Sequence, residues 1–104
     1  MEKEDFIKRL TELRVAKGQS ARDMSLAMGQ SPNYINNIEN GKSLPSLQTF
    51  FYICEHFGIT PMEFFDTRVK DPSKQNELAE VAVGLSPSET EHLIAIIKDI
   101  KNKH

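Results

Sequence analysis

The sequence predicts an all-α fold, in which five helices form one unit and a helical extension follows. Apolar residues recur three or four positions apart along most of the 104-residue chain, which is the spacing of one helix face. Helix start signals (Ser or Thr) and stop signals (Gly) divide the chain at short intervals. Five such segments fit within residues 1–66 and leave no room for a sheet.

The first two expected helices are short and amphipathic. Residues 4–17 carry apolar side chains among charges, and Gly18 ends this segment because glycine readily adopts the left-handed conformation that follows helices. A second helix is expected to begin at Ser20, whose hydroxyl can accept a hydrogen bond from the first turn, and to end at Gly29. Met24 lies on its inner face.

The third expected helix, residues 31–40, contains an unusual number of asparagines. Ser31 is predicted to cap it and Pro32 to occupy its first position, where the missing N–H is no loss. Ile35 and Ile38 are three residues apart and form its inner face. The rest of its surface carries four side-chain amides: Asn33, Asn36, Asn37 and Asn40.

Helix propensity does not explain these asparagines, because asparagine is a mediocre helix former. A surface that offers paired donors and acceptors, such as one that reads base edges, would explain them. Only a minimal turn separates the second and third helices, so they must cross steeply and pack on each other's inner faces. This arrangement is the helix-turn-helix layout.

The fourth and fifth expected helices complete the core. The fourth begins at Ser46 and ends at Gly58. Its predicted core stripe consists of Leu47, Phe50, Ile53, Cys54 and Phe57. Residues 60–63, Thr-Pro-Met-Glu, form a capping signature that opens a short fifth helix. We expect this helix to bury Met62, Phe64 or Phe65.

A polar segment that contains Pro72 is predicted to link a first domain, residues 1–66, to an extension, residues 67–104. Residues 74–83 are expected to form a modest helix. A Ser-Pro-Ser-Glu capping arrangement at 86–89 then opens a last helix that runs to about residue 101. This last helix has a wide apolar face formed by Leu93, Ile94, Ile96, Ile97 and Ile100.

The apolar face of the last helix is too wide to remain in water. It can fold back onto Phe51 and Tyr52, which occupy outward positions on the fourth helix, or it can pair with a second subunit. We favour a homodimer, because the first domain has no obvious interface of its own.

Composition limits the functions that the chain can perform. Cys54 is the only cysteine, so there is no thiolate cluster for a metal, and its aromatic neighbours predict an inert core position. The apolar runs are too short to cross a bilayer and no signal peptide is recognised, so a cytoplasmic protein is expected. No catalytic site, cofactor or small-molecule ligand is evident. Residues 1–66 carry seven Lys and Arg against nine Asp and Glu, so non-specific affinity for DNA should be weak.

Several motifs resemble one family. They are L-x-x-L-R-x-x-K-G at 10–18, Met24-Ser25, M-G-Q-S at 28–31 and Y-I-N-N-I-E-N-G-K-S-L-P-S-L at 34–47. With these, residues 6–66 resemble the lambda-repressor-like, XRE-type helix-turn-helix domains of phage repressors, Cro proteins and their bacterial relatives. The resemblance implies five helices, of which the third enters the major groove of double-stranded DNA while the second crosses the phosphate backbone.

The resemblance also implies roles for individual residues. Three residues match positions that touch base edges: Pro32, Asn33 and Asn37. Asn36 and Gln30 are further candidates for base contact. Three residues match positions that contact phosphates, namely Asn40, Lys42 and Ser43, and further phosphate candidates are Lys17, Ser20 and Arg22. Arg14 and Glu39 match positions that commonly pair, joining the first helix to the third.

Three departures from the family pattern affect the expected contacts. Ala21 stands where the family often has a phosphate-binding Gln, Gln30 replaces a small apolar residue, and Pro32 lacks a side-chain donor. We expect a sequence-specific transcriptional regulator, a repressor that binds a palindromic operator as a dimer. The alternative is a protein-interaction module that keeps the helix-turn-helix scaffold but has little affinity for DNA.

Overall fold

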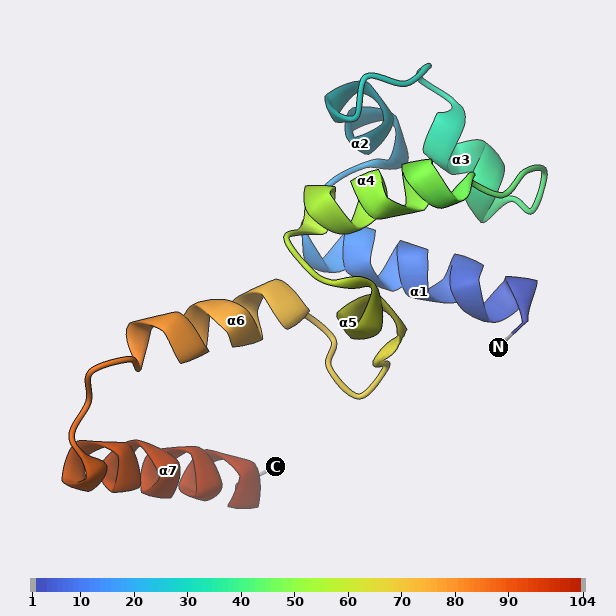
Figure 1. Ribbon diagram of the computed structural model, residues 1–104. Coiled ribbons are helices and arrows are strands. Elements are labelled where there is room, and N and C mark those ends of the chain that lie inside the picture. The colour runs from blue at the N-terminus through green and yellow to red at the C-terminus, as the bar shows by residue number, and fades with distance from the viewer. Residues whose placement is uncertain (1, 104) are drawn as a thin grey trace.

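Seven helices and no strand make up residues 2–103, the part of the chain that the computed structural model describes (Figure 1). In chain order they are α1 (Lys3–Ala16), α2 (Ala21–Ala27), α3 (Tyr34–Glu39), α4 (Leu47–Phe57), α5 (Pro61–Phe65), α6 (Pro72–Val81) and α7 (Pro87–Asn102). The prediction of an all-α fold, with five helices followed by a helical extension, is confirmed.

Helices α1 to α5 enclose one apolar core, and every one of them contributes to it. The fully or nearly buried side chains are Leu10, Leu13, Met24, Ile35, Ile38, Ile53, Cys54, Phe57, Ile59 and Phe64. Three phenylalanines join helices distant in sequence: the ring centroid of Phe6 lies 5.9 Å from that of Phe50 and 5.1 Å from that of Phe64. Burial raises the pKa of the Cys54 thiol to about 11, in keeping with an inert core position.

One residue predicted to face the core, and one of the three core candidates named for α5, are exposed. Leu47 is 69% exposed and Met62 is 80% exposed, so the predicted stripe of α4 and the inner face of α5 are shorter than their spacing indicates. Both lie in the first turn of their helix. A side chain with the right spacing is buried only where a neighbouring helix covers it, and these first turns have no such cover. In α5 the buried residue is Phe64.

A buried arginine joins the two ends of the first domain. The side chain of Arg9, only 1% exposed, donates from Nη2 to the carbonyl oxygens of Glu63 and Asp66, both at 2.9 Å. Its Nε donates to the carbonyl of Phe64. The last carbonyls of a helix have no partner within the helix and carry a partial negative charge, so a guanidinium stabilises them. This role was not predicted from the sequence.

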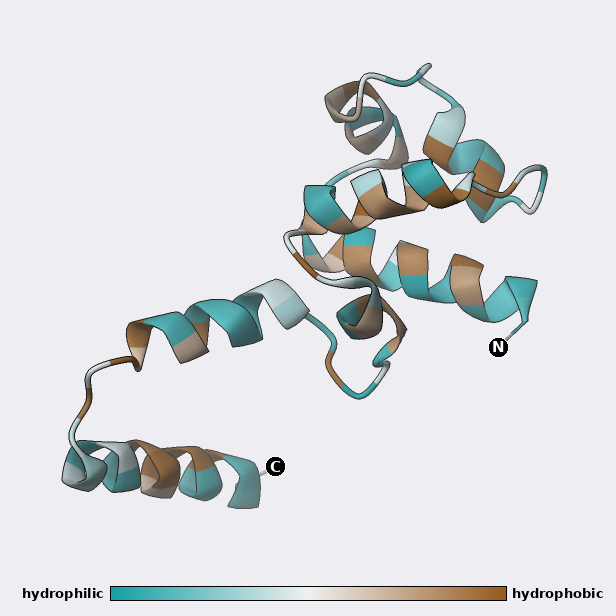
Figure 2. Cartoon of the chain, in the orientation of Figure 1, coloured by the Kyte–Doolittle hydropathy of each residue, from teal (hydrophilic) through white to brown (hydrophobic). Residues whose placement is uncertain are grey.

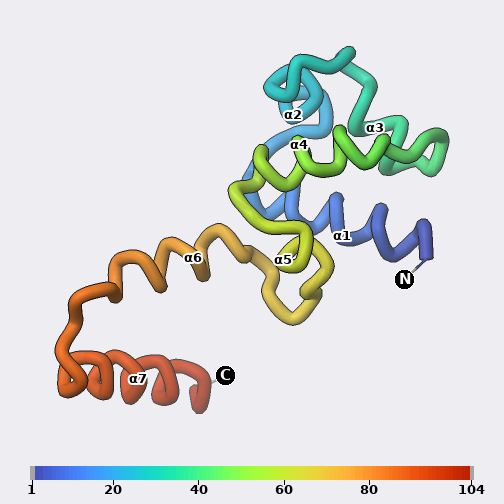
Figure 3. The backbone as a smooth tube through the Cα atoms, in the orientation of Figure 1, coloured from blue at the N-terminus to red at the C-terminus, as the bar shows by residue number. Residues whose placement is uncertain are grey.

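Helix α6 begins against the first domain and then leads away from it (Figure 3). Its first residue, Pro72, is buried and lines a small cavity with Leu13, Phe57 and Ile59. The side chain of Asp71 caps the helix by accepting a hydrogen bond from the backbone N–H of Lys74. The predicted linker is therefore shorter than expected, because α6 starts two residues before position 74.

Helix α7 lies beyond α6 and leaves its apolar face uncovered. Figure 2 shows apolar residues along α7, which lies apart from α1 to α5. No residue of α7 is buried, and the described chain is elongated, with extents of 51, 27 and 22 Å. Phe51 and Tyr52 remain 44% and 50% exposed, so α7 does not fold back onto them in this structure.

Candidate nucleic-acid interface

The turn between α2 and α3 is longer than predicted. Helix α2 ends at Ala27, and Gly29, two residues further on, has a φ of 74°, a left-handed conformation that favours glycine. The expected start of the third helix at Ser31 is wrong: Ser31 and Pro32 lie in a turn in which the N–H of Tyr34 donates to the carbonyl of Ser31 at 3.1 Å. Asn33 is the residue before the first helical position, and its side chain makes no capping hydrogen bond.

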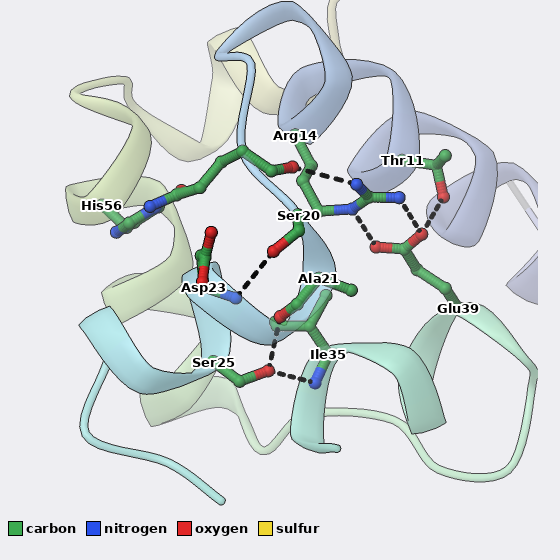
Figure 4. Close-up of polar contacts among 10 residues, drawn as sticks. Thr11, Arg14, Ser20, Ala21, Asp23, Ser25, Ile35, Glu39 and His56 are labelled. Carbon is green, nitrogen blue, oxygen red and sulfur yellow. Dashed lines mark hydrogen bonds and ion pairs between the residues drawn. The ribbon is translucent and has the colours of Figure 1, made fainter. Parts of the chain in front are cut away.

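A side chain from the neighbouring helix supports the start of α3 instead. The fully buried hydroxyl of Ser25 accepts a hydrogen bond from the N–H of Ile35 at 3.0 Å and donates to the carbonyl of Ala21 at 2.8 Å (Figure 4). Helix α2 thus satisfies one of the N–H groups that every helix leaves free at its start. The sequence analysis did not assign this role, although Ser25 belongs to the motif that carried the resemblance.

Arg14 and Glu39, which were predicted to pair, lie in contact and orient α3 on α1. Arg14 donates from Nε to Glu39 Oε2 at 2.7 Å and from Nη2 to Oε1 at 2.9 Å. Thr11 adds a hydrogen bond to Glu39 at 2.8 Å, and Arg14 also donates to the carbonyl of Gln19 (Figure 4). Donating these hydrogen bonds to the Glu39 carboxylate raises the pKa of Arg14. The carboxylate of Glu39 is therefore engaged within the protein.

The predicted base-reading amides lie along α3 on the side away from its buried isoleucines. Asn33 and Asn36 are exposed and Asn37 is half-buried. Asn36 and Asn37 follow Asn33 by three and four residues, so each of their side chains is a neighbour of Asn33 on the surface. Among the hydrogen bonds of residues 2–103, none engages the side-chain amide of any of the three. Gln30 and Pro32 are half-buried beside them, in the turn.

The predicted phosphate-contacting residues fall into two groups that flank α3. At the start of α2, Ser20 accepts a hydrogen bond from the N–H of Asp23 at 3.0 Å, and Arg22 is exposed. After α3 come three exposed residues: Asn40, Lys42 and Ser43. Lys17 is apart from both groups, because its Nζ donates to the carbonyl of His56 at 3.0 Å.

One positive charge near the second group was not predicted. Lys3, at the start of α1, donates from Nζ to the carbonyl of Gly41 at 2.7 Å. It thereby brings an ammonium group to the loop that carries Lys42. No sequence signal indicated this contact, which joins residues 38 positions apart.

The connection between α1 and α2 is held against the end of α4. His56 Nε2 lies 2.6 Å from Gln19 Oε1. Burial of the imidazole, with a smaller effect from the nearby Lys17 ammonium, lowers the pKa of His56 from its usual value. The neutral ring is therefore favoured, and the backbone before Ser20 is held in place.

Within 2–103, no group of three or more His, Cys, Asp or Glu side chains is arranged to hold a metal ion. None of the seven helices of that range combines the length and hydropathy that a membrane span requires.

Comparison with known proteins gives one match. The model of a protein family described as helix-turn-helix matches residues 10–64, which is just over half of the chain. No curated protein matches the sequence, and no solved structure does. The matched segment runs from within α1 to within α5, so it includes both helices of the motif and leaves out α6 and α7.

Proposed function

Because the chain belongs to the helix-turn-helix family of the lambda repressor and Cro type, we propose that it is a cytoplasmic, sequence-specific DNA-binding repressor of transcription. One observation supports this proposal most: α3 and the residue before it present three neighbouring amides whose side chains make no hydrogen bond within the described part of the protein. The helix that carries them is oriented by Arg14, Glu39 and the buried hydroxyl of Ser25. A rigid helix with free donors and acceptors is suited to reading base edges.

In this proposal α3 enters the major groove, with Asn33 and Asn37 contacting base edges. Asparagine can bond to the N6 and N7 atoms of adenine at once, and each such pair gives about 1–3 kcal/mol of discrimination. Asn36, Gln30 and Pro32 lie beside them and complete the contacting surface.

Phosphate contacts come from both sides of α3. The start of α2 supplies Ser20 and Arg22, and the loop after α3 supplies Asn40, Lys42 and Ser43. Lys17 reaches a phosphate only if its Nζ leaves the carbonyl of His56. Few cations are available, so one domain alone binds weakly and two half-sites are needed.

We propose that the second domain, residues 67–104, supplies this dimer, and that residues 1–66 are the DNA-binding domain. The uncovered apolar face of α7 supports this division. A dimer with twofold symmetry recognises a palindromic site with half-sites about 34–36 Å apart. Repression then results from occupancy of a promoter and requires no catalytic residue, metal, cofactor or small-molecule ligand.

A selection of DNA sequences bound by the full chain tests the proposal. We expect an enriched palindrome, and we expect its affinity to fall with salt by a slope of about −0.9 per phosphate neutralised. The net charge of −2 and Ala21, which offers no phosphate contact, favour the second candidate, a protein-interaction module. If no sequence is enriched and binding at low salt is not saturable, the DNA-binding proposal is wrong and the second candidate is favoured.

A further inference from the structure

We propose that α7 pairs with α7 of a second copy of this chain, and that the two helices run antiparallel. This inference rests on the dimer of the proposed function and names its contact surface and geometry. The twofold axis passes α7 near Ile96 and Ile97. Three observations carry it: the position of the apolar stripe, the charges at its edges and their order along the helix.

The apolar stripe lies in the middle of α7. Leu93, Ile96, Ile97 and Ile100 follow the spacing of one helix face, and Ile96, Ile97 and Ile100 are 57%, 37% and 52% exposed. The stripe is centred between Ile96 and Ile97. Pairing about that point places Leu93 of one copy against Ile100 of the other, so each of these four residues has an apolar partner, while Ile94 lies at the flank of the stripe.

The charges at the edge of the stripe change sign along the helix. At 3.6 residues per turn, Glu89 and Lys103 border the same edge, whereas Glu91 and Lys98 point away from it. Glu89 is held in place because its Oε1 accepts a hydrogen bond from the N–H of Ser86 at 2.9 Å. Lys103 lies near Asp99, at 3.2 Å, and is exposed.

This charge order favours the antiparallel pair. A twofold axis perpendicular to two facing helices brings the same edge of each stripe together, so Glu89 of each copy meets Lys103 of the other. In a parallel pair, the two Glu89 side chains lie at one end of the interface and the two Lys103 side chains at the other. Helix dipoles also oppose the parallel arrangement, because the two N-termini then lie together, as do the two C-termini, and like partial charges repel.

The same pattern identifies the occupant of the surface as a second copy. A twofold interface requires one patch that is complementary to itself. The four residues of the stripe are symmetric about its centre, and Glu89 and Lys103 at one edge carry opposite charges on the two sides of that centre, which is this kind of patch. An unrelated partner would not require either property.

The antiparallel pair also suits a palindromic site. A helix of 16 residues is about 24 Å long, and the antiparallel arrangement puts the two α7 N-termini at opposite ends of the pair. Each N-terminus leads back through α6 to its own first domain. The two recognition helices are therefore separated along the DNA rather than crowded at one end.

Disulfide cross-linking without DNA tests the orientation. Two chains of different mass, one with Leu93→Cys and one with Ile100→Cys, are mixed and oxidised. We expect the mixed disulfide to exceed either self-linked product at least about fivefold, because only residues with Cα atoms less than about 7 Å apart can be bridged. Cys54 does not interfere, since it is buried with a pKa of about 11, and the unsubstituted chain serves as the control.

Each other outcome overturns the inference. Efficient self-linking of Leu93→Cys indicates a parallel pair. A dimer by light scattering that gives no cross-link at either position indicates another interface, and a monomer removes the dimer altogether. DNA binding is measured separately, so a correct α7 pair with no operator contradicts the proposed function and leaves the pairing intact.

A charge change provides a second measurement on the same surface. Lys103→Glu places two acidic residues together at each end of the antiparallel pair, and we expect the dimer dissociation constant to rise about threefold to tenfold. Lys98→Glu makes the same change of charge on the far side of α7 and should change the constant less than about twofold. Equal effects of the two variants would contradict the inference.

Discussion

The first five helices and the last two carry the same local sequence signals, but only the first five pack together into a core. Helices α4 and α7 both begin with a Ser cap and both carry an apolar stripe. In α4, Ile53, Cys54 and Phe57 are buried by neighbouring helices, whereas α7 has no buried residue. An amphipathic pattern therefore specifies that a helix needs a packing partner, but it does not specify which partner. The family match ends where this difference begins.

The largest predicted effect contrasts one apolar residue from each region. Leu10→Ala removes a fully buried side chain, and we expect it to lower the free energy of unfolding by about 2–5 kcal/mol. Ile100→Ala shortens a half-exposed side chain and should leave unfolding of the first domain unchanged while it weakens self-association. Urea denaturation and light scattering measure the two quantities. If Ile100→Ala destabilises the first domain as much as Leu10→Ala does, the two regions are not distinct.

The next effect contrasts two arginines. Arg9→Ala removes the buried guanidinium that donates to the carbonyl groups of Glu63, Phe64 and Asp66, so we expect a loss of about 3 kcal/mol in the free energy of unfolding. Arg68→Ala is the matched control, because the exposed Arg68 pairs at the surface with the half-buried carboxylate of Asp66, and its loss should lower stability far less than the loss of Arg9 does. Thermal and urea denaturation compare them. If Arg9→Ala leaves the free energy of unfolding unchanged, the packing of Phe64 alone stabilises the position of α5.

A smaller effect concerns DNA recognition within the first domain. Asn37→Ala should relax sequence preference at one position of each half-site by about 1–3 kcal/mol. Lys42→Ala should weaken binding to all sequences alike and reduce the salt slope by about one unit. Binding titrations on the selected operator and on single-base variants distinguish these effects. Identical profiles for the two variants would refute the division into base and phosphate contacts.

The smallest effect is a dependence of stability on pH. The pKa of His56 is lower in the folded protein than its usual value near 6.5, so the unfolded chain binds more protons between the two values. The stability that the neutral ring contributes is present above pH 6.5 and decreases as the pH falls toward the lower folded pKa. His56→Gln should remove this part of the pH dependence between pH 7 and 5. If the dependence of stability on pH is the same in His56→Gln, groups other than His56 cause it.

Local sequence signals predicted the helix boundaries that depend on neighbouring residues. The caps at Ser20, Ser46, Thr60 and Ser86 are all confirmed. Each cap is a hydrogen bond to a residue three positions away, so the local sequence is enough to predict it. The resemblance, rather than periodicity, suggested that Arg14 and Glu39 pair. The base and phosphate contacts remain predictions, since they depend on DNA.

Tertiary structure alone decided the features that depend on distant residues. The sequence by itself determined the fold class, the order of the helices and the amide surface of α3, because spacing and caps act within one or two turns. The start of α3 at Tyr34, the support from Ser25 and the carbonyl contacts of Arg9 required the packed helices. So did the exposure of Leu47. Each of these features depends on which helix surfaces pack against each other, and the residues nearby in the chain do not encode that packing directly.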